Sequence, residues 1–461
     1  MPKSNRGYQW LGWMVAGSFY LYDVFLRLTC DVITSKLQAD FNLNADQVSA
    51  SFSSSFFYGY AAMQLPVGYL IDTIGPRYTI IIASLLSGFG CVLFSFAESV
   101  YIGILARVLS GIGCGCGWLG AVKVTRNSFG IDDSVKVRQI FAVTCMLGGL
   151  GGLISQAPFQ YLVSMFGWRG AYKVASIFSV FISVGSFFFV GDVEYVESKN
   201  ASTDTTINIE DSLSFNQHPN PSVTPLLEER VEDITSDASN AAVLLRCFKT
   251  PRLWLYAIYL GGSDAPFETF AGLWGCTFFV QVYGWTKQKA ATATTICVIL
   301  STVSQLGVPA AQSKFKSLKG RLNILTILAL LGALSIFPFV IGGFITSAVP
   351  DPVAYISVIT LGLSVASCTV IWSIISSDKL CNGTASTGII SGAVNSLCIA
   401  FDAMIQQLTG LVLSSLWSGQ KNKYDEPVYD AHTFSCAFMV LMGCFLLAVL
   451  CSLVASCKKN K

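Results

Sequence analysis

The chain has 461 residues, of which 53% are hydrophobic and 12% are charged, with a formal net charge of +2. Soluble domains carry about 25% charged residues, so this composition excludes a soluble protein and predicts one embedded in a lipid bilayer. The balanced charge also gives no reason to expect a nucleic-acid partner.

Apolar runs of about 20 residues, the length that crosses a bilayer as a helix, recur along the whole chain. They predict an all-α membrane protein with twelve transmembrane helices in two six-helix bundles. The expected spans of the first bundle are 10–31, 49–71, 78–97, 101–122, 139–163 and 171–191. Those of the second bundle are 252–281, 289–311, 321–346, 352–376, 385–416 and 432–456.

The two bundles are expected as residues 1–191 and 251–461, joined by a linker over 192–250. Between Asp192 and Asn240 the sequence is polar and has eleven acidic against two basic residues. Such a segment buries too little apolar surface to fold alone, so we expect a disordered acidic linker. Lys and Arg gather in the loops on one side of the spans, which predicts that both termini and the linker are cytoplasmic. The sequence fits a plasma membrane or an internal organelle membrane equally well.

Charged residues inside two spans indicate a site. Insertion scales put the cost of one charge at a helix centre at roughly 2.5 to 3.5 kcal/mol, so such residues are functional candidates. In the first span Asp23, Arg27 and Asp31 are spaced four apart and therefore share one helix face. The seventh span carries Asp264 and Glu268 at the same spacing. Both faces are expected to line a polar cavity between the bundles.

Two interpretations of Arg27 stay open: an internal ion pair with Asp23 or Asp31, or a guanidinium fork that holds a substrate carboxylate or phosphate. Asp31 also fits a solvated position at the mouth of the helix. Glu268 is our candidate for carrying a proton, with Asp264 beside it, because Pro266 predicts a kink that exposes backbone groups there. The alternative places both acids in an outer vestibule.

Uncharged side chains in the spans complete the set of expected substrate ligands. A polar group at membrane depth needs a partner, and Asn395 in particular is suited to gripping a small polar solute. Packing at the bilayer interface is the competing explanation for the aromatic members. These candidates are Tyr58, Gln64, Trp274, Trp372 and Asn395.

A turn between the second and third spans has the pattern Gly-x-Leu-x-Asp-x-x-Gly-x-Arg over Gly68 to Arg77. A charged turn must lie at the membrane surface, where its polar groups are solvated. It resembles the loop between the second and third helices of major facilitator superfamily transporters. The resemblance implies the major facilitator fold and a gate in which Gly68, Asp72, Gly75 and Arg77 clamp neighbouring helix ends.

Two further stretches resemble the same superfamily. Arg107 opens an Arg-x-x-x-Gly-x-Gly pattern similar to its fourth-helix motif, which implies either proton coupling or bracing of adjacent helices. Gly167 to Arg169 reads Gly-Trp-Arg. A closer likeness, carried by residues 19–27, 64–68 and 272–275, is to the branch that includes phagosomal nutrient transporters of intracellular bacteria, some of which resemble amino-acid importers.

Together these features predict a monomeric secondary transporter that moves a small polar or anionic metabolite, favouring an amino acid or small carboxylate, by alternating access. Protons are the expected coupling ion. The alternatives are an efflux transporter for amphipathic compounds and a nutrient sensor without transport. We expect no enzyme activity, no cofactor and no metal, because the sequence contains no nucleotide-binding loop, nucleophile arrangement or metal-ligand pattern.

Overall fold

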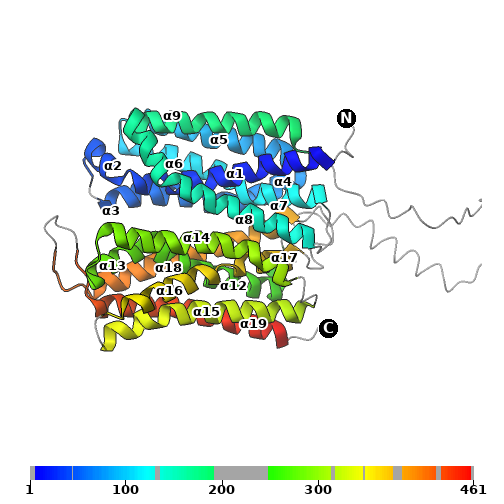
Figure 1. The fold of residues 1–461 in the computed structure, drawn as a ribbon. Helices are drawn as coiled ribbons and strands as arrows, with labels where there is room; N and C mark the ends of the chain where they lie inside the picture. The colour runs from blue at the N-terminus through cyan, green and yellow to red at the C-terminus, as the bar shows by residue number, and fades with distance from the viewer. Residues whose placement is uncertain are drawn as a thin grey trace, which may run out of the picture.

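The computed structural model describes residues 6–43, 45–129, 135–191, 245, 248–312, 317–345, 348–376, 387–421 and 427–457. Almost all of these residues are helical, and the helices form two bundles that pack against each other, one above the other in Figure 1. Nearly all of the expected linker, residues 192–250, lies outside the described residues.

The N-terminal bundle consists of the helices in the first half of the chain. They are α1 (Arg6–Val32), α2 (Thr34–Phe41), α3 (Ala45–Val48), the π-helix η1 (Ser49–Ser53), α4 (Ser54–Thr73), α5 (Pro76–Ser95), α6 (Val100–Cys114), α7 (Gly117–Phe129), α8 (Val135–Ser155) and α9 (Ala157–Phe189). One crossing is divided into α3, η1 and α4, and another into α6 and α7.

Glycine and proline set the sharp turns of this bundle. Gly75 has φ 86°, a conformation that side chains with a Cβ rarely adopt, and Pro76 then starts α5. Gly167 has φ 69° and divides α9 into the end of one crossing and the start of the next. The expected boundary between the fifth and sixth spans therefore falls where the chain turns.

The C-terminal bundle repeats this order with the helices of the second half. They are α12 (Pro251–Phe267), the π-helix η3 (Glu268–Trp274), α13 (Gly275–Tyr283), α14 (Lys287–Gln312), α15 (Leu318–Ile345), α16 (Asp351–Ser364), α17 (Ser367–Ser376), α18 (Thr387–Ser415) and α19 (Ala431–Cys457). The irregularity expected near Pro266 is the change from α12 to the π-helix η3, which begins at Glu268. π-helical turns inside helices often mark functional sites.

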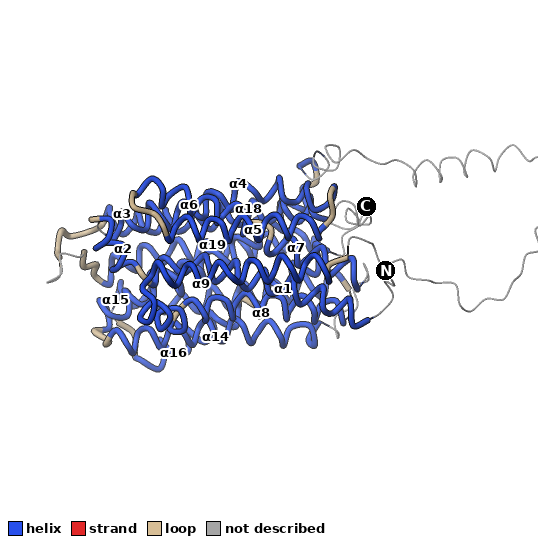
Figure 2. The backbone as a smooth tube through the Cα atoms, turned by 90° about the horizontal axis from the view of Figure 1, so that it is seen from above, coloured by secondary structure: helices blue, strands red, loops and turns tan. Residues whose placement is uncertain are grey.

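Within the described residues, 7 helices are long and apolar enough to cross a membrane. When the interrupted helices are joined, the order is that of a 12-helix membrane protein with six crossings in each bundle. Large apolar side chains such as Phe181 and Ile345 are exposed on the outside, as a lipid-facing surface requires. The first and last described helices, α1 and α19, place the two termini at the same end of the molecule (Figures 1 and 2).

Candidate functional site

Arg27 and Asp23 form a buried ion pair on the face of α1 that points into the molecule. Nη2 of Arg27 lies 3.4 Å from Oδ1 of Asp23, whose side chain is completely buried, whereas the Arg27 side chain is 20% exposed. The guanidinium also stands over the ring of Tyr60 of α4, 4.8 Å from its centre. The Asp23 contact was one of the two expected interpretations of Arg27. The remaining exposure of the guanidinium leaves it accessible to a further partner.

Three carboxyl groups of the C-terminal bundle interact with this guanidinium. Asp264 lies in α12, Glu268 begins η3 and Asp402 lies in α18, and each interacts electrostatically with Arg27. All three are partly exposed, as residues that face a polar interior are. The charged residues of the first and seventh expected spans are therefore close enough to interact electrostatically across the two bundles.

A hydrogen bond and a pair of indoles join the bundles beside this charged centre. Nδ2 of Asn395 in α18 donates to Oε1 of Gln64 in α4 over 2.8 Å, and both side chains are buried. The rings of Trp118 in α7 and Trp372 in α17 lie 5.2 Å apart. Gln64, Asn395 and Trp372, three of the expected ligands, thus lie at the contact between the two bundles.

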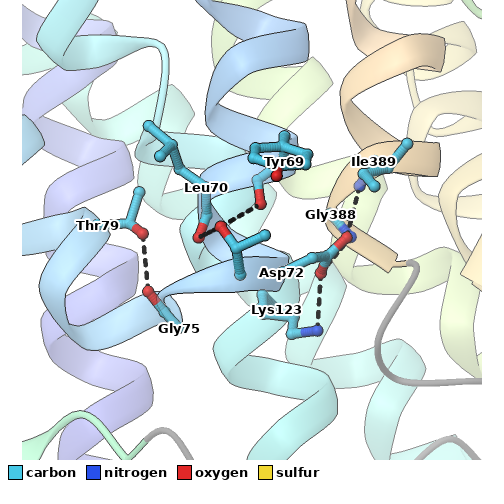
Figure 3. Close-up of polar contacts among 9 residues, drawn as sticks. Tyr69, Leu70, Asp72, Gly75, Thr79, Lys123, Gly388 and Ile389 are labelled. Carbon is cyan, nitrogen blue, oxygen red and sulfur yellow. Dashed lines mark hydrogen bonds and ion pairs between the residues drawn. The ribbon is translucent and has the colours of Figure 1, made fainter. Parts of the chain in front are cut away.

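Asp72, at the end of the molecule that carries the two termini, contacts residues of both bundles, and Figure 3 shows these contacts. Its carboxylate accepts hydrogen bonds from the backbone N–H groups of Gly388, over 3.1 Å, and Ile389, over 2.8 Å, at the start of α18. Nζ of Lys123 in α7 donates to the same carboxylate over 2.8 Å. A carboxylate at a helix N-terminus is favoured by unpaired N–H groups and the helix dipole, so Asp72 ties the two bundles together.

Arg77 and Lys123 make contacts that the turn pattern did not predict. The Nε atom of Arg77 donates to the backbone carbonyl of Val190, within the same bundle, so Arg77 braces its own half of the molecule. Lys123 of α7 forms an ion pair with Asp72, and it is only 5% exposed. In the sequence Lys123 is visible as a lysine near the end of a glycine-rich span. Its pairing with Asp72 could not be predicted from the sequence, because Asp72 lies on another helix, α4.

Close contact with the backbone of α18 explains why position 68, the first glycine of the same turn pattern, has no side chain. A Cβ atom on Gly68 would lie 2.5 Å from the carbonyl oxygen of Gly388, which is a severe overlap. The helices α4 and α18 therefore approach closely only because both positions lack side chains. Gly75 has the different task of reversing the chain direction before α5.

Tyr58 and Trp274, two further expected site residues, have other surroundings. Tyr58 is 70% exposed and shares an exposed face of α4 with Ala62 and Pro66, so it points away from the interior. Trp274 ends η3 and packs edge-on against Tyr429 at 6.1 Å. The side chain of Asp31 lies outside the described residues.

Arg107 contacts three neighbouring segments of its own bundle. It is fully buried, and its Nε and Nη1 donate to the backbone carbonyls of Phe52 and Leu26, both over 3.1 Å. Its guanidinium also lies 4.6 Å from the ring centre of Phe56. These contacts join α6 to α1, η1 and α4 inside the N-terminal bundle. Of the two roles implied by the sequence resemblance, bracing accounts for these three contacts.

The Gly-Trp-Arg stretch braces the opposite end of the molecule. Trp168 Nε1 donates to Oδ2 of Asp40 over 2.8 Å, and Arg169 forms an ion pair with the same oxygen. These two donors hold the pKa of the Asp40 carboxyl below its usual value. Arg169 Nη2 also donates to the carbonyl of Ala97 over 3.1 Å, so three segments of one bundle are joined.

The Major Facilitator Superfamily model matches residues 11–401, and the chain belongs to this superfamily. The proton:xylose symporter XylE superimposes with a TM-score of 0.70 over 97% of this chain and 95% of that one, at 13% identity. FucP in its outward conformation superimposes with a TM-score of 0.64 over 97% and 99% of the two chains, at 14% identity. These likenesses establish the twelve-helix transporter fold.

Curated relatives include a probable sulfoacetate transporter, SauU of Cupriavidus necator, which is 32% identical over 33% of this chain and 35% of its own length. YybO of Bacillus subtilis, described as an uncharacterized transporter, is 24% identical over 81% of this chain and 80% of its own. A probable L-galactonate transporter of Escherichia coli is 25% identical over 37% of each chain. The chain thus matches only about a third of the length of the two relatives with a named substrate.

Proposed function

We propose that this protein is a secondary transporter that moves a small carboxylate or amino acid across a membrane by alternating access. The observation that carries the proposal is Arg27, whose partly exposed side chain interacts electrostatically with three carboxyl groups of the other bundle. A planar guanidinium pairs with a carboxylate through two parallel hydrogen bonds, a geometry that favours this class of solute.

The relatives support the same substrate class. Sulfoacetate and L-galactonate, which two of the relatives are named for, are both carboxylates. Glu268 in the C-terminal bundle suits the ammonium group of an amino acid, and the likeness to phagosomal nutrient transporters points to such solutes. Exposed charge at the centre disfavours efflux of amphipathic compounds, because such a cavity binds apolar surface poorly.

In this proposal Glu268 exchanges the coupling proton. It begins the π-helix η3 and interacts with both Arg27 and Asp264, so protonation there changes the field at the substrate-binding guanidinium. Gln64, Asn395 and Trp372 line the path at the contact between the bundles. We leave Tyr58 out of the proposed site because it points away from the interior.

Asp72 with Lys123 and Gly68 forms the proposed gate at the end that carries the termini. We propose that this end faces the cytoplasm, so the described conformation is closed toward the cytoplasm. One chain supplies both walls of the site, which is why we propose that it works as a monomer.

Counterflow in proteoliposomes tests the proposal. Vesicles loaded with pooled unlabelled carboxylates and amino acids should accumulate a labelled member of the same pool, and R27Q should lose this uptake. Hydrogen bonds to charged groups contribute about 1.5 to 3 kcal/mol, so the variant should bind the solute about 10- to 150-fold more weakly. R169Q makes the same change at the far end of the bundle and should transport normally. Normal uptake by R27Q, or none by the folded native protein, contradicts the proposal.

A further inference from the structure

The C-terminal bundle contains a cluster of thiol and carboxyl groups that the sequence does not place together. One ligand atom each from Asp264, Cys398 and Asp402 lies within 4.8 Å of the other two. Cys398 and Asp402 are one helical turn apart on α18, with Sγ and Oδ2 at 3.9 Å, and Asp264 approaches from α12. Two ligands four residues apart on a helix plus a third from a neighbouring helix is a common way to build a metal site.

We propose that Asp264, Cys398 and Asp402 bind a divalent transition-metal ion of the zinc class. Zinc binds both cysteine sulfur, at about 2.3 Å, and carboxylate oxygen, at about 2.0 to 2.2 Å, so its ligand atoms are about 3.5 Å apart. The ligand atoms of the cluster are 3.9 Å apart for Cys398 and Asp402 and within 4.8 Å for all three, so the side chains would have to move closer together to bind the ion. Three protein ligands leave one position for water or an acidic group of a solute.

A bound cation would satisfy the unpaired carboxyl oxygen of the cluster and balance the charge of its acids when they are ionised. Oδ1 of Asp402 is buried without a hydrogen-bond partner among the described residues, and a carboxylate oxygen in that state is strongly destabilised. Arg27, the cation that interacts with Asp264, Glu268 and Asp402, is already paired with Asp23. A divalent ion supplies the positive charge that these acids lack.

The thiol decides which kind of cation fits. Calcium and magnesium take oxygen ligands, and an ammonium group gains little from sulfur, which is a weak acceptor. Cys398 is 4% exposed and stands between the two carboxyl groups, where a zinc-class ion uses it as a thiolate. On binding, the thiol releases its proton to water, so the affinity for the metal rises with pH.

A bound ion would join α12 to α18 directly before the π-helix η3. Cys368 of α17 lies next to this site, with its Sγ 3.6 Å from Oδ1 of Asp264, and orients that carboxylate. The site depends only on these side chains and does not rest on the proposed function, so its test needs no transport measurement.

Cobalt(II) absorption of the purified full-length chain in detergent tests the site. A cobalt-bound thiolate gives a sulfur-to-metal charge-transfer band in the near ultraviolet, and zinc should abolish that band by displacing cobalt. We expect one cobalt per chain in the native protein. C398S should lose the band, and D402N should bind zinc at least about tenfold more weakly in equilibrium dialysis, because even outer-shell changes cost 10- to 100-fold.

The matched control is C91A, which removes a buried thiol from the N-terminal bundle, where Cys91 contacts Tyr22. It should keep the band at full intensity, and thermal unfolding should show that all three variants are folded. A native protein without the band, or a band equally strong in C398S, overturns the proposal. Loss of the band in C398S, weaker zinc binding by D402N and retention of the band in C91A support it.

Discussion

Replacing Asp72 by Asn should loosen the contact between the two bundles at the end that carries the termini. The change removes the negative charge but keeps the shape of the side chain. Asp72 accepts from Gly388 and Ile389 across the contact between the bundles, and from Lys123 within its own bundle. Only the first two bonds cross between the bundles, so we expect the opening of this end to break them and to leave the Lys123 contact in place.

The magnitude follows from these two bonds. A hydrogen bond to a charged group contributes about 1.5 to 3 kcal/mol and a neutral one about 0.5 to 1.5, so the charge is worth about 1 kcal/mol per bond. Two bonds give about 2 kcal/mol, a figure that already includes the interaction with the helix dipole. The equilibrium between closed and open arrangements should therefore shift about 30-fold toward the open one.

Hydrogen exchange followed by mass spectrometry measures this shift directly. In the native protein the amides of Gly388 and Ile389 are protected by Asp72, and in D72N a peptide covering them should exchange about 30-fold faster. T73A is the matched control, because the Thr73 hydroxyl donates only to carbonyls of its own helix, those of Tyr69 and Leu70. Unchanged exchange in D72N, or an equal increase in T73A, would refute this account of the gate.

Three further outcomes are expected. G68A places a Cβ 2.5 Å from the Gly388 carbonyl oxygen, so exchange at the start of α18 should rise as in D72N, while G443A, a position with open space, should change nothing. E268Q should keep solute exchange but lose the response of uptake to an imposed proton gradient, and an unchanged pH profile would remove Glu268 from the proton path. D40N should destabilise the contacts of Asp40 with Trp168 and Arg169. These two residues lower the folded pKa of Asp40, so its contribution to stability exists above the unfolded pKa of about 3.9 and is lost as the pH falls through the lower folded pKa. The difference in thermal stability between native protein and D40N should therefore vanish in strong acid, and a difference that persists there would contradict this reasoning.

The sequence alone determined that the protein spans a membrane, the order of its crossings, and which residues share a face of one helix. Each of these depends on local properties: apolar length, a 3.6-residue period, and the restrictions that glycine and proline place on the backbone. That is why Asp23 and Arg27 are paired on one face of α1, and why the helix changes geometry directly after Pro266. The resemblance of the Gly68–Arg77 turn to one superfamily was enough to predict the fold that the comparisons establish.

Only the tertiary structure decided which faces meet. Asp72 accepts hydrogen bonds from the backbone N–H groups of Gly388 and Ile389, which are 316 and 317 residues further along the chain. No local sequence pattern predicts a contact over that separation. For the same reason Lys123 replaced Arg77 as the partner of Asp72, and Tyr58 proved to point outward. Helical periodicity fixes the angle between side chains on one helix. The rotation of that helix against its neighbours comes from packing of the whole bundle, which also brings Asp264 to Cys398 and Asp402.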